Sequence, residues 1–371
     1  MKLFAFRVDA SNSIGTGHVM RCLTLATQLR QTGNEVLFYC RNHPGNRIEY
    51  IESLGFAVST LCESNLGSRI EQNPPLAHSK WLGVFQIEDA QEMISKLPKN
   101  LPIFDWLIVD HYALDQTWEH KMRGYFRGLM AIDDLADRQH DCDILLDQNF
   151  YINNDERYIG KLKSDCTKIL GPEYALLRPE FYLAREKLVK KTSAVSLVLI
   201  FFGGSDNSNQ TLKVLNALKL CGDLNLKIVV VLGSNYSHKE SIREYVLQMG
   251  QQITLYDGVS NFSELMAQAD LFIGSAGVTT WERCCLGLPS LVITVAMNQV
   301  EPTQQLDGLG VLKFLGQSNS LTVEQISEGI LEFISDRSRL GEMATKAKEL
   351  VDGLGVFRCI DTLISWERHE K

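Results

Sequence analysis

Residues 3–22, LFAFRVDASNSIGTGHVMRC, decide the fold. The apolar run Leu3–Val8 predicts a buried strand, and apolar residues spaced three and four apart over 19–31 predict a helix that ends at Gly33. A loop that contains Gly15 and Gly17 joins the strand to the helix. This order of strand, glycine-bearing loop and helix is typical of the first βα unit of a parallel sheet.

The same alternation of short apolar runs and amphipathic stretches occurs twice along the chain. In the first half, further strands are expected at 35–40, 106–109, 129–133 and 144–146. After the basic, helix-like stretch 180–191, the pattern restarts with a strand at 195–202, a helix at 210–220, and strands at 226–232, 253–256, 271–273 and 290–295. Residues 323–370 are mostly helical in pattern and contain no further series of strands.

The predicted fold class is therefore α/β, with two Rossmann-like, doubly wound domains. We place the first domain in residues 1–190 and the second in 191–371, and we expect the C-terminal helices to pack across the domains. Neither the short apolar runs nor the amphipathic stretches continue over 61–85, which contains Ser, Asn, Gly and Pro residues. This stretch is expected to be a surface insertion or a lid.

Composition excludes several classes of protein. The 371 residues, 45% of them hydrophobic, suffice for two cores, and a net charge of -8 without a basic, aromatic-rich run argues against a nucleic-acid partner. The first residues contain no apolar signal segment, and no apolar run is long enough to span a bilayer, so we expect a cytoplasmic protein with no membrane partner. The nine cysteines include no CxxC pair and are expected to be reduced core residues.

The loop before the first helix contains the first candidate site. Gly15 and Gly17 let the backbone approach a ligand, but Met20 stands where a dinucleotide fingerprint has its third glycine, so no nicotinamide or flavin cofactor is predicted. His18 follows the glycine turn and is the candidate base, the alternative being a structural residue at the helix start. Arg21, one turn further on, is expected either to bind phosphate or to pair with an acid.

The next two candidate loops are rich in Asp. Asp110, His111 and Tyr112 follow the strand 106–109; Asp110 is expected to cap a turn or orient a loop, His111 is the weaker catalytic candidate, and Tyr112 is a candidate sugar contact. The acidic residues of 133–137 and 147–149 could suggest a metal site. Aspartates at strand ends have a routine structural role in turns, so no metal is predicted.

Two glycine-bearing turns mark the second half as the nucleotide-binding part. One is FGGSD, residues 202–206, with Gly204 and Ser205, and the other is GSAGVTTWE, residues 274–282, with Gly277, Val278 and Thr279. Each precedes an expected helix, so two helix N-termini are expected to converge on one diphosphate, with Glu282 accepting from ribose hydroxyls. The alternative is that these glycines only permit tight turns.

These motifs together resemble the UDP-2,4-diacetamido-2,4,6-trideoxy-β-L-altropyranose hydrolase family of pseudaminic acid biosynthesis. The resemblance covers residues 7–299 in order, and its motifs are RVDASNSIGTGHVMRC, IVDHY, IDDLADRQHDCDILLDQNF, GPEYALLRPEF, FFGGSD, GSAGVTTWERCCLGLP and the pair Asn298-Gln299. It implies a glycosyltransferase-B type fold, in which two domains face each other across a cleft. It also implies that the substrate is a small UDP-sugar.

The resemblance assigns roles to single residues. It implies that His18 is the proton acceptor, that Gly15 shapes the pocket, and that no metal or cofactor takes part. Arg178 and Glu282 are implied to bind substrate, and Tyr112 and Asn298 to line the pocket. The expected reaction is attack of water on C1 of the sugar with inversion, while the helix N-termini at Gly204 and Gly277 stabilise the departing diphosphate.

Three other functions stay open on the sequence. A glycosyltransferase of the same fold would move the sugar to an acceptor instead of water. A hydrolysing 2-epimerase would also release UDP but would invert C2. A nucleotide-sugar sensor without activity would not need His18. The oligomeric state and the stereochemistry of the accepted sugar are not determined by these patterns.

Overall fold

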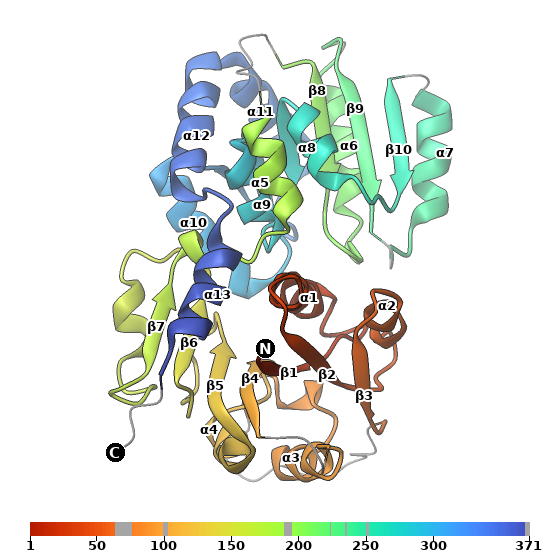
Figure 1. The fold of residues 1–371 in the computed structure, drawn as a ribbon. Coiled ribbons are helices and arrows are strands. Elements are labelled where there is room, and N and C mark those ends of the chain that lie inside the picture. Colours follow the sequence, from red (N-terminus) through yellow and green to blue (C-terminus); the bar gives the residue numbers. More distant parts are fainter. Residues whose placement is uncertain are drawn as a thin grey trace. The chain divides into compact units, whose positions relative to one another are not determined.

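The computed structural model describes residues 1–63, 76–98, 103–188, 195–222, 224–233, 236–249 and 252–367. The chain divides into two compact units (Figure 1). The first consists of residues 1–149, 153–176 and 355–371, and the second of 150–152 and 177–354. Each unit contains one parallel sheet with helices on both faces, which confirms the predicted fold class.

The sheet of the first unit has seven strands in the order β3-β2-β1-β4-β5-β6-β7. The strands are β1 (Leu3–Val8), β2 (Glu35–Arg41), β3 (Ala57–Leu61), β4 (Phe104–Asp110), β5 (Phe126–Ile132), β6 (Ile144–Asp147) and β7 (Thr167–Leu170). The helices are α1 (Gly17–Gln31), α2 (Ile48–Ser53), α3 (Gln86–Ser95), α4 (Gln116–Met122) and α13 (Gly355–Ser365).

Side chains of β1 point alternately to two cores. Phe6 shares one core with Leu25 of α1 and Val356 of α13. Ala5 shares the core on the opposite face with Met93 of α3, and α4 covers that same face. This alternation is the two-residue period of a strand that is buried on both sides, and it explains why the apolar run of β1 is nearly continuous.

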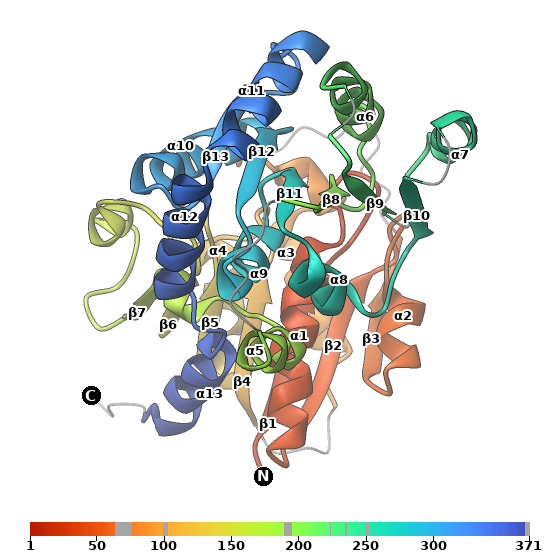
Figure 2. The same cartoon turned by 90° about the horizontal axis from the view of Figure 1, so that it is seen from above.

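The second unit has six strands in the order β10-β9-β8-β11-β12-β13. The strands are β8 (Leu197–Phe201), β9 (Lys227–Leu232), β10 (Ile253–Asp257), β11 (Leu271–Gly274), β12 (Ser290–Thr294) and β13 (Lys313–Gln317). The helices are α5 (Pro179–Glu186), α6 (Gln210–Leu220), α7 (Lys239–Met249), α8 (Phe262–Gln268), α9 (Thr279–Leu286), α10 (Val300–Leu309), α11 (Val323–Ser335) and α12 (Arg337–Leu350). Helices α6 and α11 cover one face of the sheet, and α8 and α9 cover the other (Figure 2).

The division between the units differs from the expected boundary at residue 190. It falls between Leu176 and Leu177, because α5 packs against α8 and α9 of the second sheet. The C-terminal helix is α13, which the expected division had placed in the second domain. It belongs to the first unit, where Trp366 contacts Trp106 of β4 with ring centroids 4.9 Å apart.

The expected surface insertion, residues 61–85, is partly outside the described residues, since 64–75 are not described. Leu61 ends strand β3, and Ser79–Trp81 forms a 3₁₀ turn. Six of the nine cysteines are buried, as expected for core residues, and all nine are free; Cys62 is exposed. Within the described parts of the chain, no helix combines the length and apolar character needed to cross a bilayer.

Each sheet has one point where the direction of winding reverses. In the first unit this point lies between β1 and β4, because β1 leads to α1 on one face while β4 leads to α4 on the other. In the second unit it lies between β8 and β11, which lead to α6 and α9. Loops at such points diverge and leave a crevice at the carboxyl ends of the strands. Four of the candidate loops of the sequence follow these four strands, and the acidic loops follow β5 and β6.

Candidate functional site

The first unit joins His18 to Asp110 at its reversal point. Strands β1 and β4 are paired so that Val8 lies opposite Asp110, and the loop after β1 returns His18 on the first turn of α1. The Nδ1 atom of His18 lies 2.6 Å from Oδ1 of Asp110. Both side chains are buried, and that of His18 is 10% exposed. A histidine and an aspartate 92 residues apart in sequence therefore form one hydrogen-bonded pair.

Arg21 completes this pair rather than binding phosphate. Its Nε donates to Oδ2 of Asp110 at 2.6 Å and its Nη2 to Oδ1 at 2.6 Å, while Nη1 donates to Asp134 at 3.1 Å. Of the two expectations for Arg21, the structure supports the pairing with acids. The three-residue spacing between His18 and Arg21 places both on one face of α1, so both reach the same carboxylate.

The charge state of Asp110 determines which ring nitrogen of a neutral His18 carries the proton. Burial alone would raise the pKa of Asp110, but Arg21 and then His18 outweigh it and hold that pKa below its ordinary value. Nδ1 of His18 lies 3.2 Å from the donor Nη2 of Arg21 but only 2.6 Å from Asp110. An ionised carboxylate can only accept a hydrogen bond, so the shorter contact assigns the proton to Nδ1. Nε2 then has a free lone pair, and no described residue donates to it. This is the arrangement of a general base held by a carboxylate.

Aromatic rings pack beside the base, and only one of them was expected. The ring of Tyr112 meets that of His18 edge to face with centroids 4.5 Å apart, and the Tyr112 hydroxyl donates to Asp134. Trp81 stacks on Tyr112 with centroids 5.7 Å apart, and His78 lies 4.3 Å from Trp81. Tyr112 thus packs against His18 and holds the orientation of its ring. Trp81 and His78 were missed because their segment has no strand or helix periodicity.

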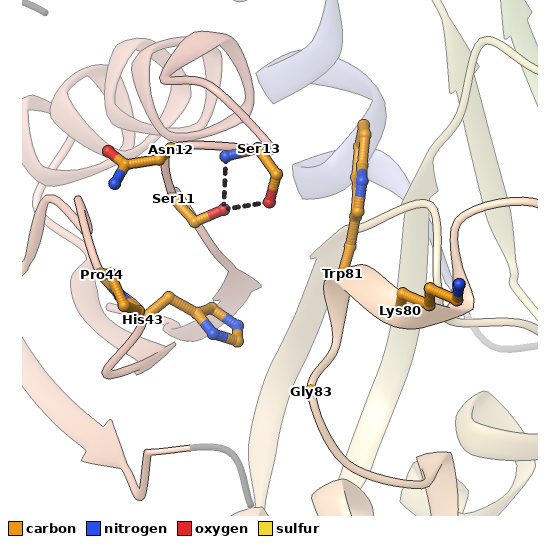
Figure 3. Close-up of a pocket in the computed structure, with 8 residues that line it drawn as sticks. All are labelled: Ser11, Asn12, Ser13, His43, Pro44, Lys80, Trp81 and Gly83. Carbon is orange, nitrogen blue, oxygen red and sulfur yellow. Dashed lines mark hydrogen bonds between the residues drawn. The ribbon is translucent and has the colours of Figure 1, made fainter. Parts of the chain in front are cut away.

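A pocket of about 360 Å³ opens next to these rings (Figure 3). Ser11, Asn12 and Ser13 line it from the loop after β1, His43 and Pro44 from the loop after β2, and Lys80, Trp81 and Gly83 from the segment before α3. Gly15 closes the first of these loops, since its N–H donates to the carbonyl of Ser11 at 2.9 Å with a φ of 78° that favours glycine. Gly17 begins α1.

His111, the weaker catalytic candidate, has a structural role. Its Nδ1 accepts from the N–H of Ala113 at 3.1 Å, and its Nε2 lies 3.2 Å from Oδ2 of Asp9. Burial, ahead of the opposing effect of Asp9, lowers the pKa of His111. The neutral ring therefore links Asp9 to the turn after β4. His43 faces the same Asp9 oxygen from the other side at 3.6 Å.

The acidic cluster after β5 and β6 consists of ion pairs. Asp133 lies 2.8 Å from Nη1 of Arg138, Asp134 accepts from Arg21, and Asp147 accepts from Arg157. These pairs explain the aspartates as structural residues of the turns. Among the described residues, no group of three or more His, Cys, Asp or Glu side chains is arranged to hold a metal ion.

In the second unit, one of the two expected anion-binding helix starts is already occupied. The turn of Gly204 and Ser205 follows β8, but α6 begins only at Gln210. Its first N–H groups, those of Gln210 and Thr211, each donate to Asp206 at 2.8 Å. The N-cap residue Asn209 accepts from the next N–H, so the start of α6 is not free to bind a diphosphate as expected.

The start of α9, in contrast, is not capped by a side chain. Gly277 has a φ of 133°, Val278 is the N-cap residue, and no side chain caps the helix that begins at Thr279. The buried Arg283 holds the turn by donating to the carbonyl of Ser275 at 3.0 Å. A β-carbon on Gly203 would lie only 3.9 Å from Ser275 Oγ, so the turns after β8 and β11 are adjacent. One uncapped helix N-terminus therefore remains in this crevice for an anion.

Glu282 is buried within α9 and does not face solvent. One of its oxygens lies 3.9 Å from Nη2 of Arg178, and the other has no hydrogen-bond partner among the described residues. Burial, only partly opposed by Arg178, raises the pKa of Glu282 to about 7. Arg178 also pairs with Glu180 at 3.0 Å. The structure thus brings together Arg178 and Glu282, which the motifs singled out 104 positions apart.

The buried carboxyl of Glu282 should make stability fall as pH rises. Below pH 4.5 the residue is protonated in both states; between pH 4.5 and about 7 the unfolded chain releases the proton while the folded protein keeps it. We expect Glu282→Gln to remove this loss, so that the variant gains up to about 3 kcal/mol of unfolding free energy relative to the parent between about pH 4 and about pH 8. Urea unfolding without ligand at both pH values measures this, with exposed Glu328→Gln as control. If the difference in unfolding free energy between Glu282→Gln and the parent were the same at both pH values, the raised pKa of Glu282 would be contradicted.

The capping of α6 gives a second prediction. Asp206→Ala should lower the free energy of unfolding by about 1–2 kcal/mol, the usual cost of losing a side chain that caps a helix start, and leave UDP affinity unchanged. The control is Asn207→Ala, which alters an exposed residue of the same turn. Thermal unfolding and calorimetric titration with UDP measure the two quantities. If Asp206→Ala lost UDP affinity at unchanged stability, the start of α6 would be part of the nucleotide site.

The candidate residues thus form two groups, one in each unit. Gly15, Gly17, His18, Arg21 and Tyr112 belong to the first unit. The second unit contains Arg178, Gly204, Ser205, Gly277, Val278, Thr279, Glu282 and Asn298. Asn298 is exposed in a 3₁₀ turn, Met297–Gln299, that follows β12, the strand next to β11.

Comparison with known proteins supports a glycosyltransferase-B type fold. The model of the glycosyltransferase family 28 C-terminal domain matches residues 198–354, which is most of the second unit and less than half of the chain. The structure resembles that of MurG from Acinetobacter baumannii, with a TM-score of 0.66 and 14% identity over 99% of this chain and all of that one. At this identity the likeness shows the fold alone.

Curated relatives narrow the comparison further. The chain is 27% identical over 295 residues to an uncharacterized protein of Methanocaldococcus jannaschii, covering 78% of this chain and 55% of that protein. The chain thus spans about half the length of that relative. It is also 27% identical over 297 residues to the UDP-2,4-diacetamido-2,4,6-trideoxy-β-L-altropyranose hydrolase of Campylobacter jejuni, covering 79% of this chain and 92% of the relative. The resemblance stated from the motifs is therefore confirmed.

Proposed function

We propose that this protein hydrolyses a UDP-linked 2,4-diacetamido-2,4,6-trideoxy sugar at its anomeric carbon and releases UDP and the free sugar with inversion. The observation that carries the proposal is the His18–Asp110 pair, which leaves Nε2 of a buried imidazole free to accept a proton. The hydrolase of Campylobacter jejuni among the relatives supports the substrate class, UDP-linked diacetamido-trideoxy sugars.

The proposed reaction needs one base and one site for a departing anion. His18 Nε2 takes a proton from water, and the water oxygen forms a bond to C1 of the sugar while the bond from C1 to the UDP oxygen breaks. The bonding electrons leave with UDP. Asp110 stabilises the imidazolium that forms, and Arg21 and Tyr112 hold this pair in position. The proton then passes to solvent.

The second unit would bind the nucleotide. The uncapped N-terminus of α9, at Gly277, Val278 and Thr279, presents N–H groups and a partial positive charge to the diphosphate. Glu282 and Arg178 are the proposed contacts to the uridine or ribose, because a buried carboxyl oxygen without a partner is suited to accept from a hydroxyl. Gly204, Ser205 and Asn298 would shape this crevice from the neighbouring turns.

The second candidate function is transfer of the sugar to an acceptor, which the match to the glycosyltransferase domain favours. The two functions are separated by phosphorus NMR of the purified protein with the UDP-diacetamido sugar and no acceptor. Release of UDP under these conditions is the expected result. If UDP appears only after an acceptor is added, the protein is a transferase. Conversion of UDP-N-acetylglucosamine to UDP and a C2-inverted sugar would identify a 2-epimerase.

A further inference from the structure

The pocket of Figure 3 has two chemically different sides. Trp81 stands on one side, and Ser11, Ser13 and His43 stand across from it. Its volume of about 360 Å³ falls in the range of small-molecule sites. None of the eight residues that line the pocket is acidic. The pocket thus combines an aromatic face with hydroxyl, amide and imidazole groups and the ammonium group of Lys80.

The polar side is built by hydrogen bonds within the chain. The N–H of Asn12 donates to the carbonyl of Pro44 at 3.1 Å, which ties the loop after β1 to the loop after β2. Ser11 Oγ accepts from the N–H of Ile14 at 3.0 Å and shares a hydrogen bond with Ser13 Oγ. His43 is buried against Asp9. These groups are therefore positioned before any ligand arrives, which lowers the entropic cost of binding.

The aromatic side connects the pocket to the candidate base. Trp81 stacks on Tyr112 at an interplanar angle of 24°, and Tyr112 packs edge-on against His18. The centroids of Trp81 and His18 are 6.4 Å apart. A sugar ring in this pocket would therefore lie beside the imidazole, and the position of Trp81 affects both the pocket and the base.

We propose that Trp81 is a specificity-determining residue, whose indole is the platform for an N-acylated deoxy sugar with its amide and hydroxyl groups toward Ser11, Ser13 and His43. This inference rests on the proposed function and adds the residue that selects the sugar. The methyl and C–H groups of such a sugar form an apolar face that suits an indole, and its amides suit neutral donors and acceptors. A sugar that lacks acyl groups would lose these contacts.

The test uses saturation-transfer NMR with the free 2,4-diacetamido-2,4,6-trideoxy-L-altrose as the probe and UDP as a second ligand. The parent protein should transfer saturation to the acetyl methyl protons. Trp81→Ala should weaken sugar binding by at least about tenfold, as truncation of a tryptophan anchor does. Trp81→Phe should retain most of the binding, and UDP affinity should stay unchanged in every variant. Tyr125→Ala, an exposed aromatic at the opposite end of the sheet, is the control.

Each outcome decides the inference separately from the proposed function. Equal sugar binding by Trp81→Ala and the parent, or no transfer to the parent, overturns the role of Trp81. Loss of UDP affinity together with sugar affinity in Trp81→Ala would show a general structural defect and would also overturn it. UDP release from the UDP-sugar by the parent is a separate measurement. The proposed hydrolysis can therefore be contradicted while the role of Trp81 is supported, and the role of Trp81 can be contradicted while hydrolysis is supported.

Discussion

His18→Ala should lower the rate of UDP release from the UDP-diacetamido sugar by about 10²- to 10⁴-fold, the contribution of a positioned general base. The substitution removes Nε2, the atom to which the proposed reaction transfers the proton of water. KM should change little, because Nε2 contacts the attacking water and not the nucleotide. Initial rates at saturating substrate measure the loss.

The matched control for this variant is His120→Ala, since the His120 side chain is 80% exposed and lies in the same unit. It should keep the parent rate. Circular dichroism should show the parent fold for both proteins. Parent-like release by His18→Ala would leave His18 as a structural residue at the start of α1, which is the alternative that the sequence left open.

Asp110→Asn should show two separate losses. An amide at this position does not hold the proton on Nδ1 of His18, so the imidazole can present the wrong tautomer, and we expect kcat to fall by about 10²- to 10⁴-fold. The variant also leaves the buried guanidinium of Arg21 without its full counter-charge, which should cost about 3–5 kcal/mol of unfolding free energy. Steady-state kinetics and urea unfolding measure the two losses.

Asp155→Asn is the control for Asp110→Asn, because the Asp155 side chain is 87% exposed. It should change neither the rate nor the stability. A variant of Asp110 that loses stability but keeps kcat would show that the carboxylate only neutralises Arg21. A loss of kcat without a loss of stability would show that Asp134 alone suffices to hold Arg21.

Strands with a buried apolar run could be predicted from the sequence, whereas three of the four edge strands could not; the fourth edge strand, β10, was predicted at 253–256. β1, β8 and β12 are runs of apolar residues because both of their faces are covered. The strands that were missed, β3, β7 and β13, are edge strands with the sequences AVSTL, TKIL and KFLGQ. They are short and partly exposed, so neither the two-residue alternation nor an apolar run identifies them.

The loops of the site could be predicted, but the partners within it could not. The reversal points of the two sheets bring together the loops that the sequence singled out, because they follow adjacent strands. Whether Arg21 meets a phosphate or an acid depends on Asp110, which is 89 positions away in sequence and is placed by the pairing of β4 with β1. Asp206 looked like part of a phosphate loop, yet its carboxylate accepts from the first N–H groups of α6, which begins four residues further on.

The most direct test of hydrolysis at C1 is to run the reaction in ¹⁸O-labelled water and to analyse the UDP by mass spectrometry and the sugar by proton NMR at the earliest times. We expect the label in the free sugar, unlabelled UDP, and a first-formed anomer opposite to that of the substrate. With His18→Ala these products should form about 10²- to 10⁴-fold more slowly. Label in UDP would mean that water attacks phosphorus, and retention of the anomer would mean a two-step displacement. Either result would contradict an inverting hydrolase with His18 as its base.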